Sequence, residues 1–249
     1  GGYNTASGSY ALYGNTTGAK NVSVGYAAIY SNTTGSCNTA IGADAMYATS
    51  SGCFNTAVGS CTLFANTTGA KNTAVGFGAL IASTCACVNT AVGFSALYKT
   101  TTGCANTALG NCALYCNTTG CRNVTIGAWA MQCGAGTYNI AIGYNTMQCN
   151  TGNNNTALGY NAMLENTSGN HNTAVGRDAL YCNTTACHNT AVGYRALCTN
   201  STGFKNTASG NYALQLNTTG ACNSSFGYQA LRNATTACHN TASGYQSSR

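Results

Sequence analysis

A 17-residue repeat runs along the chain from Asn4, and this period constrains the fold more than any other feature. The repeats follow the consensus N-T-A-V-G-x-x-A-L-Y-x-N-T-T-G-x-x, with asparagine always first and glycine always fifth. They begin at Asn4, Asn21, Asn38, Asn55, Asn72, Asn89, Asn106, Asn123, Asn139, Asn155, Asn172, Asn189, Asn206, Asn223 and Asn240. The two that begin at Asn123 and Asn139 have 16 residues.

This repeat length indicates one coil of a parallel β-solenoid, in which two or three short strands are joined by tight turns. Helix–turn–helix repeats need about 34 residues and propeller blades about 40. The glycine at position 5 indicates a positive φ or a backbone contact that leaves no room for a Cβ atom. We therefore predict an all-β fold, with residues 1–249 forming a single continuous solenoid domain of about 15 coils without clear caps.

Apolar residues recur at fixed positions and predict the interior. Position 4 is mostly Val, Ile or Leu, position 8 is small, and position 9 is Leu, Ile or Met in all fourteen complete repeats. Coils stacked about 4.8 Å apart would align these side chains as apolar ladders in a narrow core. We also expect an asparagine ladder at position 1 and a stacked tyrosine ladder at position 10.

The composition argues against an enzyme. Only 12 of the 249 residues are charged, and Asp44, Glu165 and Asp178 are the only acids. General acid/base chemistry has little to work with, so we predict no catalytic residues and no cofactor. His171, His188 and His239 share position 17, but no Cys-x-x-Cys pair accompanies them, so we predict no metal site.

The same composition limits the partners. No run of about 18 apolar residues is present, so we expect no membrane span. The net charge of +6 is spread thinly along the chain, so we expect no nucleic-acid partner.

The segments N-T-A-V-G-F-S-A-L at 89–97 and N-T-A-V-G-Y-R-A-L at 189–197 resemble a known kind of repeat. They are similar to the YadA-like, or haemagglutinin-type, head repeats of trimeric autotransporter adhesins and to repeats of phage tail-fibre proteins. The resemblance implies a left-handed parallel β-roll, usually trimeric, displayed outside the cell for adhesion. The sixteen cysteines depart from that family, which is poor in cysteine.

The cysteines recur at few repeat positions, often one coil apart. A coil spacing of about 4.8 Å lies within the Cα separation of about 4.4–6.8 Å that a disulfide needs. We predict the pairs Cys37/Cys53, Cys87/Cys104, Cys116/Cys133, Cys182/Cys198 and Cys222/Cys238, with Cys104/Cys121 and Cys133/Cys149 as competitors. Such staples imply an extracellular or cell-surface location, and reduced thiols are the alternative.

The asparagine at position 12 usually opens an N-x-[S/T] sequence, which is the acceptor for N-linked glycans. The candidates are Asn15, Asn32, Asn66, Asn117, Asn166, Asn183, Asn200 and Asn217. We expect some of them to be glycosylated in an exposed turn. The alternative is that N-T-T-G only forms the turn.

The leading hypothesis for the function is a structural subunit of an extracellular fibre or appendage, whose copies dock coil edge to coil edge. A second hypothesis is an adhesin head or fibre tip that binds a glycan on the tyrosine stripe. A third is an ice-binding protein, in which Thr56, Thr73, Thr90 and Thr107 at position 2 form a regular hydroxyl array.

Overall fold

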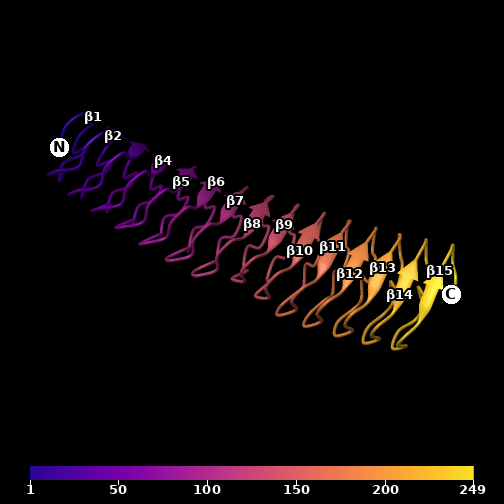
Figure 1. The fold of residues 1–249 in the computed structure, drawn as a ribbon. Coiled ribbons are helices and arrows are strands. Elements are labelled where there is room, and N and C mark those ends of the chain that lie inside the picture. The colour runs from indigo at the N-terminus through magenta and orange to yellow at the C-terminus, as the bar shows by residue number, and fades with distance from the viewer. Residues whose placement is uncertain (249) are drawn as a thin grey trace. The chain divides into compact units, whose positions relative to one another are not determined.

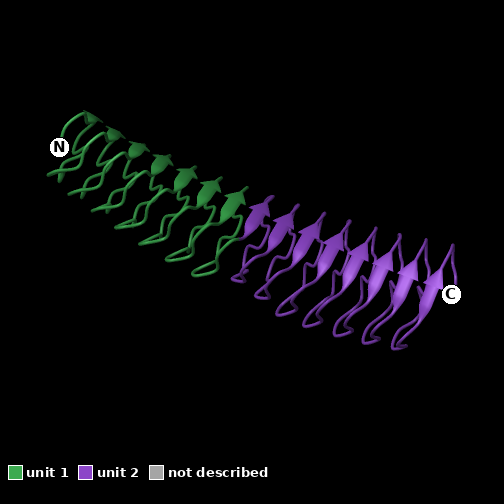
Figure 2. Ribbon diagram, in the orientation of Figure 1, with its two compact units in different colours: residues 1–122 green, residues 123–249 purple. Residues whose placement is uncertain are grey.

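The computed structural model describes residues 1–248, which form two compact units, residues 1–122 and residues 123 onward (Figure 2). Each unit is a parallel β-solenoid that advances by one coil per repeat, which confirms the predicted fold class. Among the described residues, no helix is long and apolar enough to cross a bilayer. The continuity of the two units as one domain stays a prediction, as does the handedness.

Each coil has one three-residue strand at positions 2–4 (Figure 1). The first unit has β1 (Thr5–Ser7), β2 (Val22–Val24), β3 (Thr39–Ile41), β4 (Thr56–Val58), β5 (Thr73–Val75), β6 (Thr90–Val92) and β7 (Thr107–Leu109). The second has β8 (Val124–Ile126), β9 (Ile140–Ile142), β10 (Thr156–Leu158), β11 (Thr173–Val175), β12 (Thr190–Val192), β13 (Thr207–Ser209), β14 (Ser224–Phe226) and β15 (Thr241–Ser243). Within each unit, successive strands pair in parallel with equivalent residues aligned.

The expectation of two or three strands per coil was wrong, because the remainder of each coil is built from turns. Ser95 and Leu97, at positions 7 and 9, have φ values of 53° and 54°. These left-handed conformations cannot belong to a β-strand. The turns still join the coils, since the Leu97 amide donates to the carbonyl of Ala113 in the next coil at 3.0 Å.

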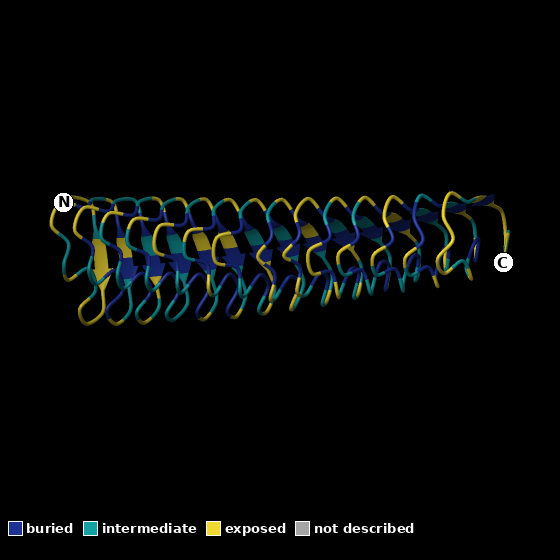
Figure 3. Cartoon of the chain, turned by 90° about the horizontal axis from the view of Figure 1, so that it is seen from below, coloured by how far each residue is buried: buried dark blue, intermediate teal, exposed yellow. Residues whose placement is uncertain are grey.

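The core lies between position 3 on one side and positions 8 and 9 on the other. Ala91, Ala96 and Leu97 are fully buried, and their equivalents recur along both units (Figure 3). Successive side chains of a strand point to opposite faces, so a buried alanine at position 3 turns positions 2 and 4 outward. The predicted core ladder at position 4 was therefore wrong: Ile41 and Leu109 are 42% and 45% exposed.

This correction predicts that position 4 tolerates polar residues. Ile41→Thr keeps a β-branched side chain on the outer face of the strand, and we expect the free energy of unfolding to change by about 0.5 kcal/mol or less. Ile29→Thr, at the fully buried position 9, should cost about 2 kcal/mol or more because it buries a hydroxyl group and leaves a gap. Chemical denaturation of both variants checks the assignment. If the two variants lost the same free energy of unfolding, position 4 would have to lie in the core.

Candidate functional site

The outer face of the sheet in the first unit presents two regular columns of side chains. In five consecutive strands, β3 to β7, position 2 is threonine and position 4 is aliphatic. The pairs Thr56↔Thr73 and Val58↔Val75 show the alignment, which places like side chains about 4.8 Å apart. Val22 interrupts the threonine column at β2. The result is a flat surface of hydroxyl and methyl groups with a constant spacing.

Buried asparagines line every coil between the first and the last at position 1 and many coils at position 12, and those at position 1 join one coil to the next. At position 1, the backbone amide of Asn72 donates to Oδ1 of Asn55 at 3.0 Å, and the amide of Asn89 donates to Oδ1 of Asn72 at the same distance. At position 12, Nδ2 of Asn66 donates to the carbonyl of Gly69 at 3.1 Å. Nδ2 of Asn55 reaches the same carbonyl at 2.8 Å. The predicted asparagine ladder at position 1 is confirmed. In the second unit, where neighbouring coils both have asparagine at position 12, Nδ2 of Asn183 also donates to Oδ1 of Asn166 at 2.7 Å, which was not foreseen.

The burial of position 12 contradicts the exposed turn on which the glycosylation prediction depended. Seven of the eight candidates are fully buried, namely Asn32, Asn66, Asn117, Asn166, Asn183, Asn200 and Asn217. Nδ2, the atom that a glycan would occupy, donates instead to a carbonyl of its own coil in each of them. Asn15 is partly exposed, but its Nδ2 also donates to the carbonyl of Gly18. The folded coil therefore leaves no room for a glycan at the seven buried positions.

The structure has all sixteen cysteines as free thiols, and the predicted disulfides stay a prediction. Cys87, Cys104 and Cys121 share position 16 in three consecutive coils. The amides of Cys87 and Cys104 each donate to the sulfur of the next cysteine at 3.2 Å. Cys104 Sγ in turn donates to the carbonyl of Thr102 at 3.3 Å. Ser36 makes the same two kinds of contact with its hydroxyl group, so a thiol can replace a hydroxyl at this position.

Three of the predicted pairs join different columns of side chains: Cys37/Cys53 and Cys222/Cys238 join position 17 to position 16, and Cys182/Cys198 joins position 11 to position 10. Cys53 Sγ accepts from the backbone amide of Ser36, its position-16 equivalent, and not from that of Cys37. Cys238 Sγ likewise accepts from Ala221, the residue before Cys222. The two cysteines of each of these pairs are 16 residues apart in coils of 17 residues, which places them one position out of register.

The pairs Cys116/Cys133 and Cys182/Cys198 differ in their setting. Cys116 lies in the first unit and Cys133 in the second. Cys182 and Cys198 lie in adjacent coils of the second unit, where the amide of Cys182 donates to the carbonyl of Cys198 at 2.9 Å.

Cys182 and Cys198 line a groove of about 490 Å³ in the second unit. Asp178 is buried there, and its Oδ2 lies 3.5 Å from Nε of both Arg177 and Arg195. The guanidinium group of Arg177 lies 5.3 Å from the ring centre of Tyr160, which is within the range of a cation–π contact. The two arginines therefore compensate the buried carboxylate.

Burial raises the pKa of the Cys182 thiol to about 11, and Glu165 and Cys198 add to the shift. Since only the thiolate reacts with alkylating agents, we expect Cys182 to be labelled slowly at neutral pH. Its rate should rise about tenfold per pH unit from pH 7 to 10, without a plateau. Mass-spectrometric mapping of iodoacetamide labelling measures this rate. A plateau near pH 8 would contradict the shift, and labelling only after reduction would reveal the Cys182/Cys198 disulfide.

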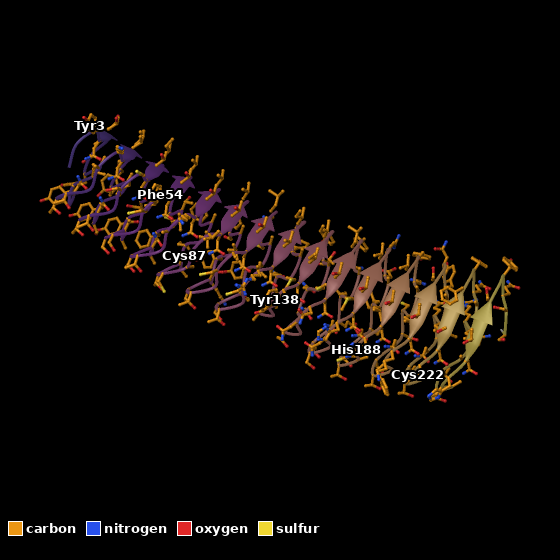
Figure 4. The ribbon with its side chains drawn as sticks, viewed as in Figure 1. Tyr3, Phe54, Cys87, Tyr138, His188 and Cys222 are labelled. Atoms are coloured by element: carbon orange, nitrogen blue, oxygen red, sulfur yellow. The ribbon has the colours of Figure 1, made fainter. Side chains whose placement is uncertain are left out.

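Two of the three position-17 histidines stack on one another. The rings of His171 and His188 are parallel, with centres 5.1 Å apart, and His188 is labelled in Figure 4. Within residues 1–248, no three His, Cys, Asp or Glu side chains gather where they could hold a metal ion.

No known protein family, curated protein or solved structure matches the chain. The resemblance of residues 89–97 and 189–197 to adhesin head repeats therefore stays a prediction.

Proposed function

We propose that the chain is a structural subunit of an extracellular fibre or surface appendage, in which copies stack end to end through their solenoid coils. The observation behind this proposal is the uniform pairing between coils. Inside the first unit, the amide of Thr73 donates to the carbonyl of Asn89, and the amide of Gly93 donates to that of Val75, both at 2.8 Å. Every strand edge therefore offers the same pattern of donors and acceptors.

The outer edges of β1 and β15 are complementary in this pattern. Among the described residues, β1 pairs only with β2 and β15 only with β14. The amide of Thr241 and the carbonyl of Ser243 point outward from β15, because their equivalents in every inner coil bond to the following coil. The carbonyl of Asn4 and the amide of Gly8 occupy the matching places on β1. A strand edge with this pattern is a template for another strand that offers the matching groups.

The extracellular setting is supported by the cysteine content, since sixteen cysteines suit an oxidising compartment. A heterologous contact that does not close on itself produces a filament, which is the assembly expected here.

The test compares the purified chain with two variants at the edge of β15. Thr241→Pro removes the outward amide and no hydrogen bond within the coil, whereas Thr241→Val keeps that amide. We expect sedimentation velocity and electron microscopy to show filaments for the wild type and Thr241→Val, and single particles for Thr241→Pro. Single particles of all three at high concentration would reject the proposal.

Ice binding is the second candidate, and the outward columns of β3 to β7 favour it. Thr73 and Thr90 are exposed, and each shares its face with an aliphatic residue two positions later. Thermal hysteresis of the chain measures this activity. We expect Thr73→Tyr, which roughens the flat face, to lower it strongly, and Asn111→Tyr, off the sheet, to leave it unchanged. Absence of hysteresis in the wild type would remove this candidate.

A further inference from the structure

Two aspartates occupy position 7 of their repeats but have opposite surroundings. Asp178, in the second unit, lies between the guanidinium groups of Arg177 and Arg195. Asp44 is the only acidic residue in the first unit, and its carboxylate makes no hydrogen bond or ion pair with any residue among 1–248. Asp44 is therefore an anion without a protein cation among the described residues.

Asp44 closes one end of a cavity of about 480 Å³ in the first unit. Position 7 of three consecutive coils is Tyr10, Ala27 and Asp44. The small Ala27 is buried and forms the floor. Tyr10 and Asp44 form the two ends, because two coil spacings separate their backbones by about 9.6 Å. The cavity exists because alanine stands between two larger residues in this column.

The rings of four tyrosines form the walls. Tyr30 and Tyr47, at position 10, stack in parallel with ring centres 4.9 Å apart. Tyr10 stands across them, at 66° to Tyr30 and at 89° to Tyr26, with centres 6.3 and 6.0 Å apart. Tyr30 stacks between Tyr13 and Tyr47, so its edge and not its face lies on the lining. Tyr10 and Tyr26 have no parallel neighbour among the described residues, which leaves their faces open beside the Asp44 carboxylate.

We propose that this cavity binds a small organic cation with a methylated ammonium group. The face of an aromatic ring attracts a cation, so the open faces of Tyr10 and Tyr26 suit a quaternary ammonium group, whose methyl groups pack on the rings. The carboxylate supplies the opposite charge that the site otherwise lacks. This inference does not depend on the proposed fibre function.

Two substitutions separate the charge from the rings without threatening the fold. Asp44 has a φ of 56°, and asparagine accepts this left-handed conformation readily, so Asp44→Asn removes only the charge. Tyr26 is 56% exposed, so Tyr26→Ala removes one wall at little cost in stability. Phe94→Ala is the matched control: Phe94 also occupies position 6, is 53% exposed, and lies outside the cavity.

The experiment titrates the chain with tetramethylammonium and with choline, following the tyrosine ring resonances by NMR. The neutral control ligand is 3,3-dimethyl-1-butanol, which has the shape of choline without its charge. We expect Asp44→Asn to weaken choline binding about fivefold and Tyr26→Ala by a similar factor. Phe94→Ala should bind as the wild type does. Circular dichroism verifies that each variant is folded.

Equal binding of the neutral analogue, or unchanged binding by Asp44→Asn, would overturn the proposal. So would saturation of the same resonances by a neutral sugar at lower concentration than by choline.

A second arm identifies the source of the cation. Binding to phosphatidylcholine vesicles, but not to phosphatidylglycerol vesicles, assigns the cavity to a lipid headgroup. Binding of free choline alone assigns it to a small solute. Both results support the methylated ammonium group as the ligand, and binding to neither overturns it.

Discussion

Replacing Asn72 by alanine is expected to destabilise the first unit by about 3–5 kcal/mol. Two buried groups lose their partners: the backbone amide of Asn89, which donates to Oδ1 of Asn72, and the carbonyl of Ala86, which accepts from its Nδ2 at 2.8 Å. Each unsatisfied buried group costs about 1–3 kcal/mol. Urea unfolding followed by circular dichroism measures the loss, and hydrogen exchange should show faster exchange at the Asn89 amide.

The matched control is Asn111→Ala. Asn111 is exposed at position 6, so we expect a change of about 0.5 kcal/mol or less. If the Asn72→Ala and Asn111→Ala variants had the same free energy of unfolding, the position-1 ladder would have no role in holding the coils together.

Gly93→Ala should be comparably severe, at about 3 kcal/mol or more, for a different reason. Gly93 has a φ of +137°, a region that is open almost only to glycine. A Cβ atom there would lie 2.4 Å from the carbonyl oxygen of Gly110 and 2.7 Å from its carbon. Both atoms are backbone of the next coil, so relief of the clash requires the coils to separate. Thermal unfolding measures the effect.

Gly78→Ala separates the effect of positive φ from that of the close contact. Gly78 has a φ of +65°, and Ser95 adopts a similar conformation at the same repeat position. A Cβ atom on Gly78 would only touch the ring of Tyr98 at 3.4 Å. We expect a change of about 1 kcal/mol or less. Equal losses for Gly78→Ala and Gly93→Ala would show that backbone contact between coils does not explain the glycine at position 5.

The repeat period was enough to predict the solenoid and two of its ladders. In-register stacking follows directly from a constant repeat length, so the buried asparagines at position 1 and the stacked rings of Tyr30 and Tyr47 were both foreseen. When all coils have the same length, backbone pairing between equivalent residues fixes the register of one coil on the next.

The face of each side chain could not be predicted in the same way. Alanine and valine are both apolar in the T-A-V strand, so alternation alone does not show which of them lies inside. The thin interior takes the alanine, as at Ala74, and valine turns outward. The exposure of Asn66 was predicted wrongly for a related reason. The N-T-T-G pattern is typical of an exposed turn, but in the structure its asparagine points into the coil and is buried.

The Asp44 cavity was beyond sequence analysis because it needs the shape of the turns. Tyr26 and Tyr30 lie in the same coil as Ala27, and Asp44 follows one repeat later. The residues with positive φ between positions 6 and 10 turn the backbone so that these side chains line the same cavity. The sequence does not show the shape of these turns.

A crystal structure at side-chain resolution tests most directly the claim that equivalent residues of successive repeats stack on one another. It should show Nδ2 of Asn72 within hydrogen-bond distance of Oδ1 of Asn55, with Thr73 paired between Thr56 and Thr90. Strands paired out of this register, or position-1 asparagines beyond hydrogen-bond reach of one another, would contradict the account.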